Sequence, residues 1–129
     1  MTLKLTLKPG ESVFVGTTRV SVISRSTCTV IIEGTSPVMR GAEWLDSSEA
    51  ATPLDRFRYI LQEMYLRNST HELILDYFKA AEALFAAEPD LRAVIGEVND
   101  RLLEGALWDA VRLVRYACRR TEARYLLSA

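Results

Sequence analysis

The stretch LKLTLKPGESVFVG, residues 3–16, alternates apolar and polar side chains on both sides of a Pro-Gly pair. Side chains of a β-strand point alternately to its two faces, so this alternation separates the leucines from the lysines and threonines. One face of the first segment carries Leu3, Leu5 and Leu7, and the other carries Thr2, Lys4, Thr6 and Lys8. Because Pro-Gly favours a turn, the stretch predicts a β-hairpin near the start of the chain.

Strand signals continue through the first third of the chain. Further short segments rich in β-branched residues, each bounded by turn residues, lie at 18–24, 28–33 and 38–40. Together with the hairpin they predict five short strands in a small antiparallel sheet or barrel. Because five strands in about 40 residues bury little apolar area, we expect this half to need a partner surface, either from the chain's own helices or from a second copy.

The second half carries helix signals. Thr52 and Pro53 form a helix-start signature, with threonine as N-cap and proline at the first helical position. Apolar residues at spacings of three and four, interrupted near residues 68–70, 88–90 and 105, predict about four amphipathic helices. The NST stretch at 68–70 is predicted to end the first of these helices and to cap the next. The predicted fold class is therefore α+β, with a β domain over residues 1–46, a linker over 47–52 and a helical domain over 53–129.

Composition limits the partners and the compartment. The 129 residues carry a net charge of −1, so no overall cationic field attracts a polyanion and any such partner must be held by a local patch. No apolar run approaches the roughly 18 residues that span a bilayer, and the alternating start is unlike a signal peptide. The cysteines, Cys28 and Cys118, are far apart in the sequence and form no metal-binding motif. We expect a cytoplasmic protein with reduced thiols and no membrane contact.

The sequence contains little that could support catalysis. His71 is the single histidine, which excludes HExxH and the Cys/His zinc patterns. The phosphate loop GxxxxGK[ST], the dinucleotide motif GxGxxG and the nucleophile elbow GxSxG are also missing from the printed sequence. We therefore expect neither an enzyme nor a cofactor.

Two groups of basic residues are candidates for binding. Lys4 and Lys8 share one strand face and form either a local anion-binding patch or an ordinary polar surface. The last helix carries a basic stripe at spacings of three and four, made of Arg112, Arg115 and Arg119. That stripe is either a solvated flank paired with nearby carboxylates or a contact for a phosphate or an acidic protein.

Over its whole length the chain resembles the FlbT family of flagellar biosynthesis repressors. The resemblance rests on LKLTLKPGE at residues 3–11 and on the helix that opens at Thr52-Pro53 and runs to MYL at 64–66. It implies a post-transcriptional regulator of flagellin synthesis that acts on the 5′ untranslated region of flagellin mRNA. It also implies a small helical partner of the FlaF type that opposes this action.

The first 44 residues also resemble the carbon storage regulator CsrA, through LTLKPGESVFVG, RVSVIS, TVIIEGTSPV and MRGAE. This resemblance implies a CsrA-like sheet, a homodimer with interlocked strands, and an RNA site along the first strand and the partner's fifth strand. Leu7 stands where the regulators carry a basic residue, so we expect weaker or more partner-dependent RNA binding. The implied RNA-binding residues are Lys4, Leu5, Lys8, Val38 and Arg40.

Two functions from different classes follow. In the first, the protein binds the flagellin mRNA leader through its sheet. In the second, the sheet serves only for dimerisation, and the helical half binds a FlaF-type protein or flagellin through Arg112, Arg115 and Arg119. Either function is compatible with a homodimer or a higher homo-oligomer.

Overall fold

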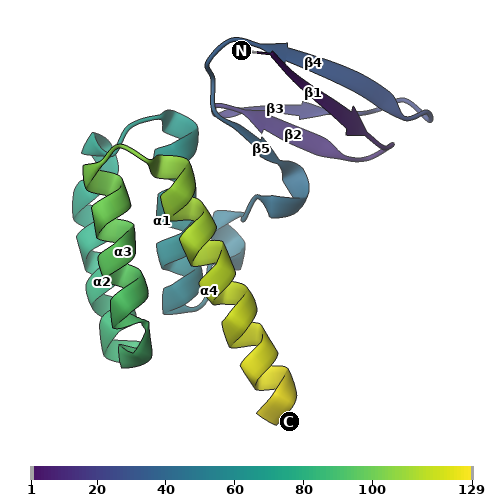
Figure 1. Ribbon diagram of the computed structural model, residues 1–129. Helices are drawn as coiled ribbons and strands as arrows, with labels where there is room; N and C mark the ends of the chain where they lie inside the picture. The colour runs from purple at the N-terminus through teal and green to yellow at the C-terminus, as the bar shows by residue number, and fades with distance from the viewer. Residues whose placement is uncertain (1, 129) are drawn as a thin grey trace. The chain divides into compact units, whose positions relative to one another are not determined.

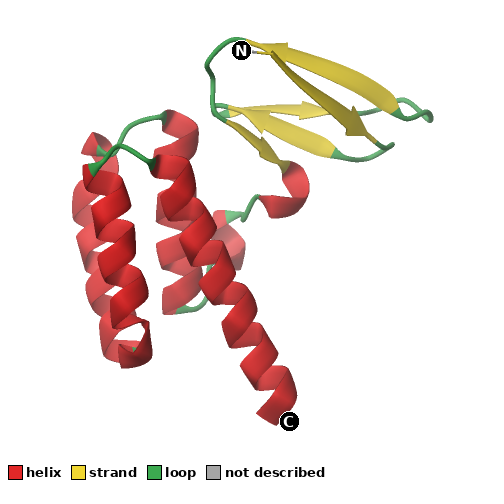
Figure 2. Ribbon diagram, in the orientation of Figure 1, coloured by secondary structure: helices red, strands yellow, loops and turns green. Residues whose placement is uncertain are grey.

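The computed structural model describes residues 2–128, with side chains described up to residue 124. The predicted α+β class is confirmed, because five strands in the first part of the chain are followed by a bundle of about four helices (Figures 1 and 2). The residues form two compact units. The β unit comprises the residues up to Trp44 together with Leu66–Asn68, and the helical unit comprises Leu45–Tyr65 and the chain from Ser69 onward.

The five predicted strands are present, and they form two antiparallel sheets. One sheet pairs β1 with β4, and the other has the order β3-β2-β5. The third strand ends at Ser21, three residues earlier than the sequence pattern predicts. The bounds are β1 Thr2–Leu7, β2 Ser12–Val15, β3 Thr18–Ser21, β4 Cys28–Glu33 and β5 Val38–Arg40.

The alternation that opens the chain separates a core face of β1 from a solvent face, as predicted. Leu5 and Leu7 are buried and form a cluster with Val13 of β2. Lys4 lies on the opposite, exposed face, directly across from Ile31 of β4. The two-residue period of the strand therefore fixes which side chains of β1 reach solvent.

Glycine permits two tight features of the β unit. Gly16 adopts a φ of 59° in the hairpin that joins β2 to β3, a backbone conformation that favours glycine. Gly41 follows β5 and passes close to β2, so that a Cβ at this position would lie 2.9 Å from the carbonyl oxygen of Ser12. At Gly41 the close approach to β2 requires the absence of a side chain, and no unusual φ is involved.

The four helices of the bundle are joined by short segments. A buried glutamine, Gln62, ties the start of the unit to the first helix, because its side chain accepts a hydrogen bond from the Leu45 N–H at 2.7 Å and donates one to the Leu45 carbonyl at 2.8 Å. The interior includes Phe57 and Tyr77, whose ring centroids are 5.3 Å apart. The bounds are α1 Pro53–Arg67, α2 Ile74–Ala87, α3 Arg92–Leu103 and α4 Leu107–Ser128.

A capping hydrogen bond and two positive backbone φ angles confirm three of the predicted helix boundaries. The Thr52 hydroxyl accepts from the Asp55 N–H at 3.1 Å, so threonine is the N-cap of α1. Asn68, with a φ of 53°, ends α1, and Gly105, with a φ of 76°, ends the segment after α3. The prediction that residues 68–70 also cap the next helix is wrong, because a 3₁₀ turn precedes α2 and the Thr70 side chain makes no capping bond.

Candidate functional site

Two of the predicted RNA-binding residues, Lys4 and Lys8, are exposed on β1 or directly after it. Lys4 is exposed in the middle of the strand. Lys8 is exposed just after the strand ends, in a turn closed by two hydrogen bonds to Glu11. In these bonds the Lys8 N–H donates to the Glu11 carboxylate at 2.6 Å, and the Glu11 N–H donates to the Lys8 carbonyl at 3.0 Å. The turn thus fixes the main chain that carries the Lys8 ammonium group.

Arg40 brings a third cation to the same strand. It lies at the end of β5, is exposed, and its guanidinium Nη1 lies 3.5 Å from the carbonyl oxygen of Thr6. Thr6 stands between Lys4 and Lys8 in the sequence of β1. The Arg40 guanidinium therefore lies beside the main chain at a position that stands between two exposed lysines, Lys4 and Lys8, in the sequence.

The remaining two predicted contacts lie on the inner side. Leu5 is buried, with 8% of its surface exposed, and Val38 is partly buried against the cluster that Leu5 forms with Leu7 and Val13. Their side chains support the sheet and do not share the exposed face of Lys4.

A ring stack that the sequence did not predict lies on the second sheet. The ring centroids of Phe14 and Trp44 are 4.5 Å apart in a stacked arrangement, and the Arg19 guanidinium lies 5.8 Å from the Phe14 centroid. Phe14 itself is buried. Its ring is occupied by protein contacts and is not available as a platform for bases.

The inner face of the β unit is incompletely covered. Leu3 and Val20 point to the core side but remain 40% and 39% exposed. In addition, β1 pairs with β4 alone and β5 pairs with β2 alone among the described residues, so each strand keeps one edge that joins no other strand. Partly exposed apolar side chains beside unpaired strand edges are features of a surface that a further strand can cover.

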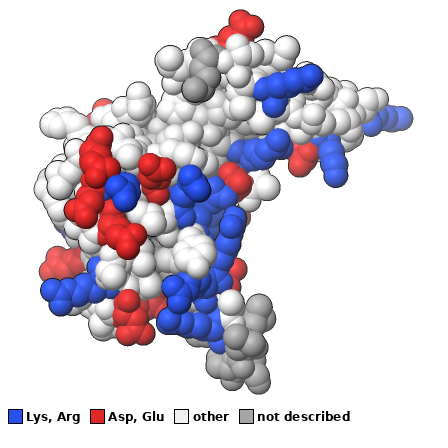
Figure 3. Space-filling model, in the orientation of Figure 1, with Lys and Arg blue, Asp and Glu red and all other residues white. Residues whose placement is uncertain are grey.

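The three predicted arginines of α4 have different surroundings. Arg112 and Arg119 are exposed, and Arg112 lies 3.9 Å from Asp109 on the same helix. Arg115 is partly buried, with its guanidinium 5.8 Å from the Trp108 ring. Figure 3 shows further basic side chains along α4. Arg120, which the spacing of the basic stripe did not single out, has its guanidinium 5.9 Å from the ring centroid of the exposed Tyr116.

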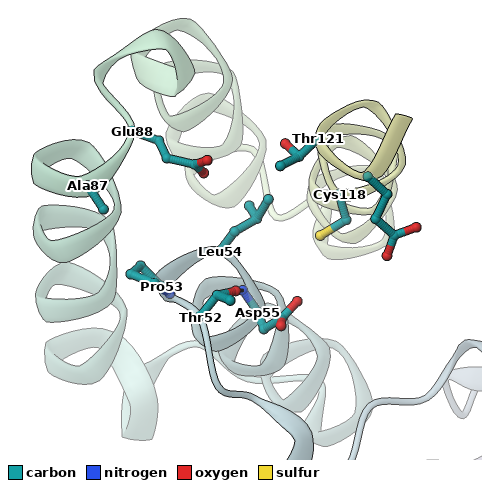
Figure 4. A pocket seen from close by; sticks show the side chains of 9 residues that line it. Thr52, Pro53, Leu54, Asp55, Ala87, Glu88, Cys118 and Thr121 are labelled. Atoms are coloured by element: carbon teal, nitrogen blue, oxygen red, sulfur yellow. Dashed lines mark hydrogen bonds between the residues drawn. The ribbon is translucent and has the colours of Figure 1, made fainter. Parts of the chain in front are cut away.

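A hollow of about 360 Å³ lies in the helical unit between the start of α1, the end of α2 and the middle of α4 (Figure 4). Cys118 lines it, together with carboxylates that include Asp55 and Glu88. Burial raises the pKa of the Cys118 thiol to about 11, so the thiol remains protonated at neutral pH and is a poor nucleophile. Within the described residues, no group of three or more His, Cys, Asp or Glu side chains is arranged to hold a metal ion.

None of the described helices combines the length and the hydropathy that a membrane-spanning helix needs.

The class of protein is indicated by relatives that match 90% or more of this chain and are named as probable flagellum biosynthesis repressors. A family model described as "Flagellar protein FlbT" matches residues 3–126, and the chain belongs to this FlbT family. The family is one of flagellar regulators rather than of enzymes.

Two of the relatives illustrate the similarity. The probable flagellum biosynthesis repressor protein FlbT of Rhodopseudomonas palustris strain TIE-1 is 33% identical over 127 residues, which cover 95% of this chain and 96% of the relative. The probable flagellum biosynthesis repressor protein FlbT 1 of Bradyrhizobium diazoefficiens is 30% identical over 123 residues, which cover 90% of this chain and 82% of the relative. No solved structure matches the chain significantly.

Proposed function

We propose that this protein represses flagellum biosynthesis after transcription, by binding the 5′ untranslated region of flagellin mRNA along β1. The observation that supports this proposal is the Arg40 guanidinium at 3.5 Å from the Thr6 carbonyl, between the positions of Lys4 and Lys8. Lysine and arginine side chains bind phosphates and release counterions, which provides the electrostatic part of RNA affinity. At the rise of a strand, Lys4 and Lys8 are about 13 Å apart along β1.

The sequence specificity would come from groups other than aromatic side chains. Phe14 is buried in its stack with Trp44, so base stacking on it is prevented. Single-stranded loops expose the hydrogen-bonding edges of their bases. The exposed Thr6 hydroxyl and the Arg40 guanidinium are suited to hydrogen-bond to such edges.

We also propose that the protein acts as a homodimer. Joining the free edge of β1 to the free edge of the partner's β5 would unite a two-stranded and a three-stranded sheet into one five-stranded sheet. The same association would place a further strand beside the partly exposed core-side residue Leu3 of β1. It agrees with the CsrA-like arrangement expected from the sequence.

The RNA proposal is tested by titrating a labelled flagellin leader RNA with the full-length protein. The Lys8→Ala/Arg40→Ala double variant should bind roughly tenfold more weakly, because two phosphate contacts are removed. Arg25→Ala removes an exposed arginine of the same unit that lies outside β1 and β5, and it should bind like the wild type. Equal affinity of the double variant and the wild type would reject the β1 site.

A second candidate function is a protein–protein module that binds a FlaF-type protein or flagellin through α4. The observation that favours it is the exposure of Arg112 and Arg119 on one side of that helix. Reversing both charges, in Arg112→Glu/Arg119→Glu, should abolish capture of such a partner by the full chain in a pull-down with purified proteins. Arg92→Glu, an exposed arginine on α3, is the matched control and should leave capture unchanged.

A further inference from the structure

The outer side of α2 presents large apolar side chains to solvent. Leu75, Phe78 and Phe85 are 72%, 57% and 46% exposed. Their spacings of three and seven residues place them on one side of the helix. The buried residues of α2, Tyr77 and Leu84, lie on another side. The helix therefore has two apolar sides, and only one of them is used by the core of the described chain.

The neighbouring helix α3 also leaves an apolar side chain exposed. Leu103 is 87% exposed, and Gly96, Asn99 and Leu103 follow one another at spacings of three and four on a common side of α3. Asn99 accepts a hydrogen bond from the hydroxyl of the buried Tyr77, so this side of α3 borders the buried side of α2. We give the name α2–α3 outer face to the exposed residues Leu75, Phe78 and Phe85 of α2 together with Gly96 and Leu103 of α3.

Gly96 is unexplained by the packing of the described chain. It lies in the middle of α3, where glycine weakens a helix relative to alanine. A Cβ at this position would meet no atom within 4 Å, and the residue is exposed. A glycine on a helix surface allows the main chain of another molecule to approach closely. Gly96 is thus an independent indication that something packs on this face.

The charge around the α2–α3 outer face indicates what kind of partner can bind there. Residues 69–106, which contain α2 and α3, carry eight acidic and three basic side chains, and Figure 3 shows acidic side chains over these two helices. This charge repels RNA, and it opposes a symmetric contact with the same face of a second copy. It favours an apolar partner surface with basic flanks.

We propose that the α2–α3 outer face binds a basic amphipathic helix of another protein. The stripe from Leu75 to Phe85 follows the helix axis for about 15 Å, a length that matches a partner helix of roughly ten or more residues. Apolar side chains of the partner would pack on Phe78 and Phe85, and its main chain would approach Gly96. This surface shares no residue with β1 or with the arginines of α4, and the proposal does not depend on RNA binding.

The test uses full-length protein and a fluorescently labelled 18-residue Leu/Lys peptide, with leucines at helical spacings of three and four. A Leu/Glu peptide with the same leucines is the peptide control. Anisotropy should show binding of the Leu/Lys peptide alone, and Phe78→Asp should weaken that binding at least tenfold. Ile23→Asp removes an apolar side chain that is 97% exposed in the β unit, and it should leave the affinity unchanged.

Gly96→Ala is a second test variant, and we expect it to fold because alanine favours the helix. It should raise the melting temperature by about 3 °C, because alanine favours the helix. The same variant should weaken binding of the Leu/Lys peptide severalfold, because the added methyl group blocks close approach.

Three results would overturn the proposal. The first is equal affinity of the protein for the Leu/Lys and Leu/Glu peptides. The second is an affinity for the Leu/Lys peptide that neither Phe78→Asp nor Gly96→Ala changes. The third is a sedimentation mass that falls when Phe78 is replaced by aspartate. The last result would mean that a second copy covers this face. Leader RNA affinity should be the same for Phe78→Asp and the wild type, so failure of this proposal is distinguishable from failure of the RNA proposal.

Discussion

A methyl group on residue 41 would collide with the main chain of β2. At Gly41 the Cβ would lie 2.9 Å from the Ser12 carbonyl oxygen, and a carbonyl in a paired strand cannot move away at little cost. We expect Gly41→Ala to lower the free energy of unfolding by about 1–3 kcal/mol. Urea denaturation followed by circular dichroism measures this change.

Gly96→Ala is the matched control for Gly41→Ala. Its Cβ meets no atom within 4 Å, so we expect it to raise the free energy of unfolding by about 1 kcal/mol. Opposite signs for two Gly→Ala changes in one chain would reflect close packing at Gly41 and open space at Gly96. Equal effects of the two substitutions would contradict the packing described for β2 and β5.

At the scale of single elements, local sequence patterns predicted where strands and helices begin better than they predicted which side chains are buried. The alternation of β1 and the Thr52 cap depend on neighbouring residues in the sequence, and the sequence predicted them. The exposure of Phe78 and the contact of Arg40 with Thr6 depend on which elements pack together. A hydrophobic period indicates that a helix has an apolar side, but it does not show what covers that side.

The unpaired edges of β1 and β5 predict the oligomeric state. We expect sedimentation equilibrium to yield a dimer of the 14.5 kDa chain, because pairing of these edges would satisfy main-chain groups and place a strand beside the partly exposed Leu3. Thr6→Pro removes an N–H from β1 and should increase the monomer fraction. A wild-type protein that stays monomeric at micromolar concentration would contradict the interlocked sheet.

For the whole molecule, the near-zero net charge means that affinity for RNA must arise locally. On the face that Figure 3 shows, basic side chains lie along α4, and acidic side chains predominate over α2 and α3. The β unit adds the exposed lysines Lys4 and Lys8. The charges therefore offer different surfaces to a polyanion and to a basic partner.

The central claim is that Lys8 and Arg40 contact phosphates of the flagellin leader RNA. The most direct test is the slope of the logarithm of the binding constant against the logarithm of salt concentration. For single-stranded RNA each lost phosphate contact reduces the steepness by about 0.7, so Lys8→Ala/Arg40→Ala should reduce it by about 1.4. A slope that is the same for the wild type and the double variant would contradict the account.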